Sequence, residues 1–184
     1  HELVADSTFD PLLLAPLQDL ARNGVAVVAS TGNESTSRPM YPAAFAPHAG
    51  GEVPAFDGNC VPLISVGALN PDRTIALFSN AGPWVACHRP GAGLVSTFPQ
   101  TFDAGGQSSF RVESDEGVRA TMDPDNFAGG FGTWSGTSFA APILAGELAQ
   151  ALLDGCADRL DAADATSCVQ RGWSAVTACT GAKP

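Results

Sequence analysis

The sequence has few basic residues and no long apolar run. Among 184 residues there are 9 Lys and Arg against 19 Asp and Glu, a formal net charge of −10, and this charge excludes nucleic acid and anionic membranes as natural partners. No stretch reaches the roughly 18 uncharged apolar residues that a membrane-spanning helix needs. The opening residues also lack a basic segment followed by an apolar one, so no signal peptide is visible. What remains, 45% hydrophobic and 15% charged residues, is typical of a packed globular protein.

The cysteines lack the C-x-x-C spacing of redox motifs and the spacing of zinc sites. Disulfides formed in an oxidising compartment are the favoured interpretation, and they predict a secreted, extracellular protein. Five buried reduced thiols are the alternative. Cys60 and Cys87, which flank neighbouring predicted strands, form the candidate pair. The complete set is Cys60, Cys87, Cys156, Cys168 and Cys179.

Helix and buried-strand patterns follow one another in the first part of the chain. Asp10 is suited to cap a helix with Pro11 in its first turn, and leucines at helical spacing predict that helix over 11–22. The apolar run 25–29 predicts a strand buried on both faces. Helix, turn and buried strand together are typical of half a βαβ unit.

Later elements are predicted from similar patterns. Strands are expected over 63–68, 75–78 and 84–87. The alanine-rich segment 139–153 predicts the strongest helix, which Gly155 is placed to end.

A serine lies at the start of that helix. Ser138 stands in Gly-Thr-Ser-Phe-Ala-Ala-Pro, residues 136–142. Backbone N–H groups at a helix N-terminus are unpaired and the helix dipole adds partial positive charge, so an oxyanion forming beside Ser138 would be stabilised. An isolated Gly-Thr-Ser more often only caps a helix, and its context therefore decides.

That context resembles the subtilisin-like serine proteases (subtilases, peptidase S8 family). The segment 136–142 resembles their nucleophile motif. The segment 25–34 is similar to their buried strand ending in Gly-Asn, whose Asn side chain donates to the oxyanion. The strand 63–68 and the turn Phe-Ser-Asn-x-Gly at 78–82 follow in the same order. The resemblance implies that Ser138 and Asn33 are catalytic.

The resemblance also implies the fold and the domain limits. We expect an α/β chain that forms part of a three-layer αβα subtilisin-like fold with a mostly parallel central sheet. Residues 1–155 would be the carboxyl-terminal half of the peptidase domain, with an insertion at about 100–126. Residues 156–184 would form a Cys-containing tail.

The motifs of the family's catalytic acid and base are not found in this sequence. The base comes from His-Gly-Thr and the acid from Asp-Thr-Gly or Asp-Ser-Gly, and His1, His48 and His88 lie in other contexts. The resemblance therefore implies a serine endopeptidase half that cleaves peptide bonds through an acyl-enzyme when a second chain or segment supplies Asp and His. Alone, the chain is expected to be inactive.

The resemblance places one wall of the primary substrate pocket on this chain. Glu34, near its floor, is suited to accept a basic or polar side chain, or is simply an exposed loop carboxylate. Met40 is placed to narrow the pocket. The residues assigned to substrate binding are Ala29, Ser30, Thr31, Gly32 and Glu34.

The sequence leaves one alternative function open and excludes another. A catalytically silent protease-like domain that binds a peptide or a protein partner is the alternative of a different class. An α/β-hydrolase elbow at Gly136-x-Ser138 fails, because no apolar strand precedes it and no histidine follows. No metal ligands or cofactor are assigned; calcium stays open for the complete enzyme, with only a weak cluster at Asp123, Asp125 and Asn126.

Overall fold

The computed structural model describes residues 10–48, 56, 59–99, 101, 111–120, 129–155 and 164–182. They belong to two compact units. The first takes its residues from 1–92 and 136–184, and the second comprises 93–135.

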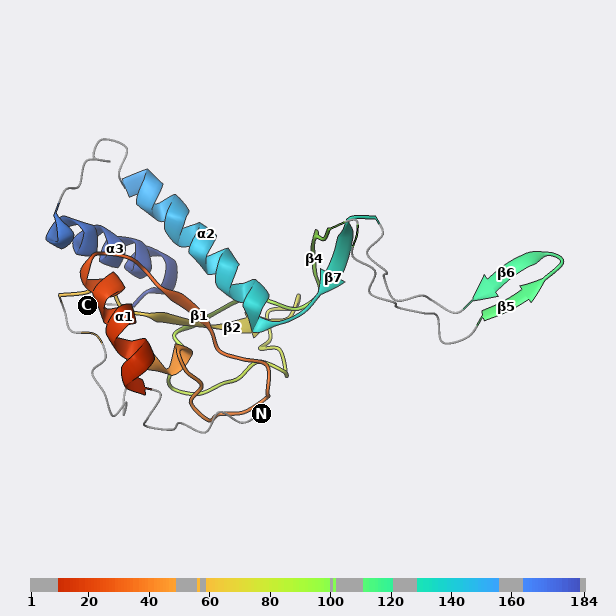
Figure 1. Cartoon of the computed structure of the whole chain (residues 1–184), viewed down its shortest axis with the longest axis horizontal. Helices are drawn as coiled ribbons and strands as arrows, with labels where there is room; N and C mark the ends of the chain where they lie inside the picture. Colours follow the sequence, from red (N-terminus) through yellow and green to blue (C-terminus); the bar gives the residue numbers. More distant parts are fainter. Residues whose placement is uncertain are drawn as a thin grey trace. The chain divides into compact units, whose positions relative to one another are not determined.

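A parallel three-stranded sheet forms the centre of the first unit (Figure 1). Its strands are β1 (Val28–Ser30), β2 (Ile64–Leu69) and β3 (Cys87–Pro90), in that spatial order. Val28 pairs with Ile64, and Val66 pairs with Cys87. The central strand β2 is buried from its first residue to Ala68, as expected for a parallel strand covered on both faces.

Helices cover both faces of this sheet. On one face lies α2 (Thr137–Gly155), whose Leu144 and Leu148 pack into one core cluster with Ile64 and Val66. On the other face, a second cluster contains Leu63 and Trp84, the 3-10 helix η1 (Ala43–Phe45) and leucines of α1 (Asp10–Arg22). The observed architecture is thus an α/β arrangement with a parallel sheet, as predicted. Tyr41-Pro42, which leads into η1, is a cis peptide.

A third helix, α3 (Ala165–Thr180), was not predicted from the sequence. Asp164 caps it, accepting a hydrogen bond from the Ser167 backbone N–H at 2.8 Å. Gly181, with φ of +76°, ends it in the left-handed conformation. The Trp173 Nε1–H donates to the Cys60 carbonyl at 2.9 Å, so the helix is anchored beside the entry to β2.

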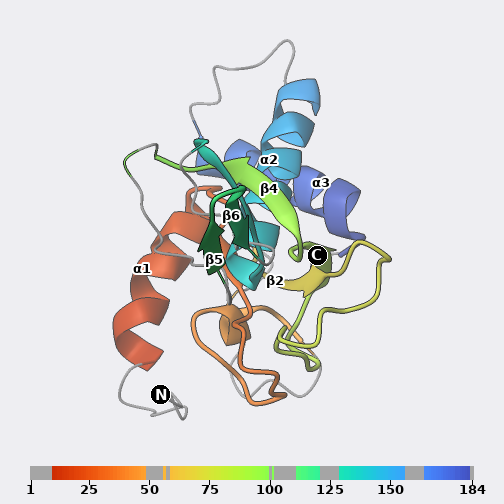
Figure 2. The ribbon, with the colours of Figure 1, turned by 90° about the vertical axis from the view of Figure 1, so that its right-hand side faces the viewer.

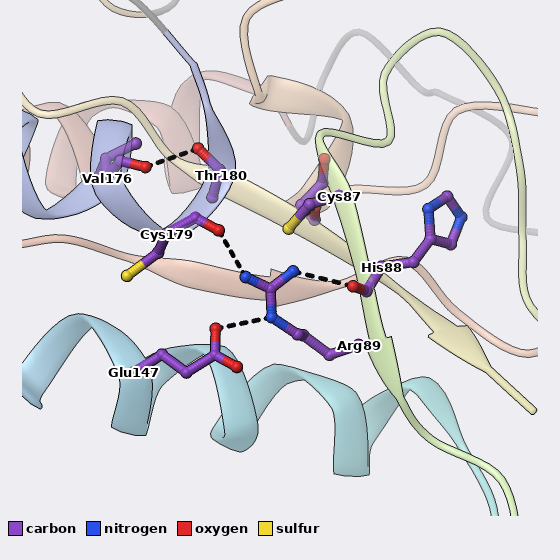
Figure 3. A network of polar contacts seen from close by, with 8 residues as sticks. Cys87, His88, Arg89, Glu147, Val176, Cys179 and Thr180 are labelled. Carbon is purple, nitrogen blue, oxygen red and sulfur yellow. Dashed lines mark hydrogen bonds and ion pairs between the residues drawn. The ribbon is translucent and has the colours of Figure 1, made fainter. Parts of the chain in front are cut away.

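Arg89 of β3 joins α2 to the end of α3 (Figure 3). Its Nε donates to Glu147 Oε2 at 2.7 Å and its Nη2 to the Cys179 carbonyl at 2.6 Å. The second contact satisfies a carbonyl in the last turn of a helix, where the helix itself supplies no donor. One side chain therefore connects the sheet to both helices on this face.

The second unit is built from antiparallel pairs. Strands β4 (Leu94–Thr97) and β7 (Phe131–Trp134) pair with each other, and β5 (Arg111–Ser114) pairs with β6 (Gly117–Ala120) in a hairpin. The side chains of residues 112–119 are exposed. No helix in the described ranges is both long enough and apolar enough to span a membrane.

Two of the predicted strands are wrong. Within 75–78, Ile75 forms only an isolated bridge with Leu69, and Leu77 is 89% exposed. The segment 84–87 contributes only its last residue to a strand, because β3 runs from Cys87 to Pro90. Both segments are short continuous runs of apolar residues. Only the second leads into a strand of the sheet, and that strand begins at Cys87.

The predicted disulfide is also wrong. Cys87 is a free thiol, so the Cys60 to Cys87 bridge is not formed, and Cys179 is a free thiol as well. Burial raises the pKa of Cys87, an effect that the nearby Arg89 partly offsets. The argument for a secreted protein rested on disulfides, and it loses this support; Cys156 lies outside the described residues.

Candidate active site

The loop that follows β1 begins with a buried threonine and a glycine of unusual conformation. The Thr31 backbone N–H donates to the Val66 carbonyl at 3.1 Å and so prolongs the pairing with β2. Gly32 has φ of +97°, a conformation that L side chains rarely adopt. A Cβ at Gly32 would lie 2.5 Å from each of Asn80 Nδ2, Glu34 Oε2 and Met40 Sδ. Both the φ angle and the close neighbours therefore require glycine.

Asn33 connects this loop to the start of α2. Its Oδ1 accepts from the Thr137 backbone N–H at 2.8 Å and from the Thr137 hydroxyl at 3.1 Å. Since a backbone N–H can only donate, the oxygen of the Asn33 amide is the group turned toward Thr137, and the Nδ2–H₂ group remains for another acceptor. Thr137 Oγ1 in turn accepts from the Gly32 N–H at 3.1 Å. These bonds bring together residues that are 104 and 105 positions apart in the chain.

Ser138 is the second residue of α2 and is exposed, whereas Thr137 before it is fully buried. The approach to the helix is held by the Gly136 N–H, which donates to the Gly91 carbonyl at 2.7 Å. The Thr137 side chain is hydrogen-bonded to Asn33 and Gly32. It therefore does not cap the helix, which is the role that a Gly-Thr-Ser segment often has. The serine side chain is accessible at a helix N-terminus, and the residue before it is bonded to the Asn33 amide.

Glu34 follows Asn33 on the same loop and is exposed, but one of its carboxylate oxygens is engaged. Glu34 Oε2 accepts from Asn80 Nδ2 at 2.7 Å. The Met40 sulfur lies 3.9 Å from the same nitrogen. Glu34, Met40 and Gly32 therefore meet around one amide group.

The other residues assigned to substrate binding differ in accessibility. Ala29 is 7% exposed and belongs to the core cluster on the α1 face, and Thr31 is fully buried. Ser30, the last residue of β1, is half-buried. Ala29 and Thr31 therefore present almost no surface to solvent, whereas Ser30 and Gly32 are half-buried.

Two residues of this site were not assigned from the sequence. Thr137 was treated only as part of the serine motif, and Asn80 only as part of a turn. Both are 0% exposed, and a buried threonine or asparagine has to be hydrogen-bonded; the sequence alone gives no sign of this burial.

Two histidines, His48 and His88, lie within the described residues. His48 Nδ1 is 2.8 Å from the Ala46 carbonyl oxygen. His88, on β3, has a buried Nε2 without a hydrogen-bond partner, and desolvation lowers the pKa of its ring. His1 is outside the described residues, as are Asp123, Asp125 and Asn126. In the described part of the chain no three His, Cys, Asp or Glu side chains are grouped as a metal site would require.

Comparison with known proteins gives consistent results. A model of the subtilase family matches residues 10–155. Among solved structures, the prenylagaramide maturation protease PagA is similar with a TM-score of 0.52 at 23% identity, over 85% of this chain and 42% of that one. The self-cleaved protease domain of PatA is similar with a TM-score of 0.51 at 23% identity, over 94% of this chain and 56% of that one. The chain thus shares their fold and spans about half the length of each.

Proposed function

The chain belongs to the subtilase family, and from this premise we propose that it is the part of a serine endopeptidase domain that carries the nucleophile and the oxyanion-binding groups. One observation carries the proposal: the 2.8 Å bond from the Thr137 N–H to Asn33 Oδ1. This bond places the Asn33 amide beside the residue that precedes Ser138. The serine motif and the Gly-Asn motif, far apart in the sequence, thereby become one site.

In the proposed site the oxyanion is bound by two donors. Asn33 Nδ2 is one, since its oxygen is held by Thr137, and the Ser138 backbone N–H at the start of α2 is the other. Donors that are fixed before the reaction need no reorganisation when charge develops, and removal of one such donor typically slows the reaction about 10²- to 10³-fold.

The proposed reaction is acyl transfer. Ser138 Oγ adds to the carbonyl carbon of a peptide bond while its proton passes to a histidine base. The C–N bond then breaks, the amine leaves with that proton, and the acyl group stays on Ser138 as an ester. Water adds to the ester, gives one proton to the base and releases the acid, and Ser138 Oγ recovers the proton.

We place the base and its orienting Asp on a second chain or segment. Among the described strands, β1 is an edge of a parallel sheet, and parallel sheets are normally covered and continued by further strands. The similar solved structures are also longer than this chain. The additional segment would pair with β1, close to Asn33 at the carboxyl end of that strand. The acidic net charge gives nucleic acid and anionic membranes no role in this scheme.

For the substrate we infer a basic or polar side chain on the acyl side of the cleaved bond. Glu34 is exposed beside Gly32, and Asn80 holds only one of its carboxylate oxygens. The other oxygen is suited to an ammonium or guanidinium group. In this proposal the backbone of Ala29, Ser30 and Thr31, together with Gly32, forms the pocket wall that faces this carboxylate.

A fluorophosphonate probe tests the proposal, because it reacts only with an activated serine. The chain would be treated alone and after co-expression with a subtilase segment that carries the Asp and His motifs, and the modified residue would be identified by peptide mass. We expect Ser138 to be labelled in the complex and not in the isolated chain. A complex that contains the Ser138→Ala variant should not be labelled on this chain. An unlabelled Ser138 in a stable complex would favour the silent binding domain instead. Equal labelling of the isolated chain would show that the base lies within this sequence.

A further inference from the structure

Asn80 is an extensively hydrogen-bonded side chain near the candidate site. It lies in the segment after β2 and is 0% exposed. In Figures 1 and 2 this yellow-green segment runs beside the orange loop that follows β1. A buried amide without hydrogen-bond partners destabilises the fold, so the partners of Asn80 show which segment it holds.

The polar contacts of the Asn80 amide all reach the loop after β1. Its Oδ1 accepts from the backbone N–H groups of Glu34 at 3.0 Å and Thr36 at 3.1 Å. Its Nδ2 donates to the Thr31 carbonyl at 2.9 Å and to Glu34 Oε2 at 2.7 Å. Its own backbone N–H donates to the Gly32 carbonyl at 3.0 Å. The amide thus uses both donors and both acceptor sites.

The orientation of this amide follows from its partners. Two of them are backbone N–H groups, which can only donate, and one is a carbonyl, which can only accept. Asparagine satisfies this set, whereas the isosteric aspartate would direct a carboxylate oxygen at both the Thr31 carbonyl and the Glu34 carboxylate. The site therefore selects an amide at position 80 on chemical grounds.

We propose that Asn80 is a positioning residue for the site: it holds the loop 31–36 on both sides of Asn33, and it aims the Glu34 carboxylate toward substrate. This inference rests on the proposed protease function. Asn33 is bonded to Thr137 on one side, and its neighbours in the chain are bonded to Asn80 on the other. Such a frame limits the movement of the Asn33 Nδ2 group relative to Ser138, and misplacement of a catalytic group by about 1 Å can cost about 100-fold in rate.

The decisive variant is Asn80→Asp. It retains an acceptor for the Glu34 and Thr36 N–H groups and removes both donors. Asn70→Asp is the matched control, because the Asn70 amide donates at 3.0 Å to Thr74 Oγ1 in a turn outside the site.

The first readout is hydrogen exchange in the chain by itself, which needs no activity. We expect Asn80→Asp to accelerate exchange in the loop 31–36, while the β2 amide of Ile64, which donates to the Val27 carbonyl, keeps its protection. Unchanged exchange in the loop would overturn the proposal, and so would equal acceleration throughout β2, since that would make Asn80 a general element of stability. If Asn80→Asp does not fold, Asn80→Ser is measured by the same criteria.

The second readout is fluorophosphonate labelling of Ser138 in the complex with the Asp- and His-bearing segment. We expect the rate to fall about 10- to 100-fold in Asn80→Asp and to stay at the parental value in Asn70→Asp. The double variant Asn80→Asp, Glu34→Gln should recover part of the rate, because the amide introduced at position 34 can donate to the carboxylate introduced at position 80. No recovery would contradict the role of Asn80 toward Glu34. If even the parental complex is unlabelled, the proposed function fails, while hydrogen exchange still decides whether Asn80 holds the loop.

Discussion

The loop that follows β1 and the hairpin β5–β6 are both surface segments, but they are held differently. The loop is bonded to Asn80, to Phe78 and to Thr137, that is, to groups far away along the chain. The hairpin is held by the ladder between its own strands, and its side chains from 112 to 119 are exposed. Residues proposed for chemistry thus lie where distant parts of the chain hold the backbone, which is what preorganised catalysis requires. Substitutions at matched positions in the two segments test this contrast.

The largest effect is expected at Asn33. Asn33→Asp keeps the oxygen that binds Thr137 and replaces the Nδ2 donor by a charged oxygen, so the labelling rate of Ser138 in the complex should fall about 10²- to 10³-fold. Val118→Asp adds the same charge to the hairpin and should leave the rate unchanged. Labelling kinetics on both variants checks this. Equal effects would indicate that the added negative charge acts at long range, and not that a specific donor has been lost.

The next effect concerns the core. Leu144 is 0% exposed in α2, and Leu144→Ala should lower the free energy of unfolding by about 2–5 kcal/mol. Val118, 56% exposed in the hairpin, should lose less than about 0.5 kcal/mol on replacement by Ala. Urea unfolding followed by circular dichroism compares the two; a large loss for Val118→Ala would mean that the hairpin side chains are covered in solution.

A smaller effect is expected for the arginines. Arg89→Ala removes the bonds to Glu147 and to the Cys179 carbonyl, and we expect a loss of about 1–3 kcal/mol. Arg119→Ala, on the exposed hairpin, should change stability by less than about 0.5 kcal/mol. Thermal unfolding of both variants tests this, and a loss confined to Arg119→Ala would refute the role of Arg89 in docking α3.

The smallest effect is a pH dependence from His88. Desolvation lowers the pKa of His88 below its ordinary value of 6.5, so the unfolded chain takes up a proton that the folded chain resists. Stability from this source is complete above pH 6.5 and is lost as the pH falls from there toward the folded pKa. His88→Met should therefore lose less stability than the parent as the pH is lowered through this window, measured by urea unfolding. An identical slope in both proteins would show that His88 does not contribute.

The sequence predicted the strongly patterned elements well. The helices predicted over 11–22 and 139–153 correspond to Asp10–Arg22 and Thr137–Gly155, and the strand over 63–68 to Ile64–Leu69. The two helices have apolar residues at helical spacing, and the strand segment is apolar apart from Ser65 and Gly67. The helix Ala165–Thr180 was missed although it is amphipathic: small residues such as Gly172 and Ala175 form much of its buried face, and it has none of the leucines that mark the helix Asp10–Arg22.

The family resemblance, the candidate nucleophile Ser138 and the candidate donor Asn33 could be recognised from the sequence, since they follow from short motifs with local backbone requirements. The folded chain was needed to see that Asn33 binds Thr137, that Asn80 is bonded to the loop beside it, and that Cys87 is a thiol. The difference lies in the range of the interactions. Propensity and periodicity report on neighbours in the chain, whereas hydrogen bonds across 46 and 104 positions depend on how β1, β2 and α2 pack together.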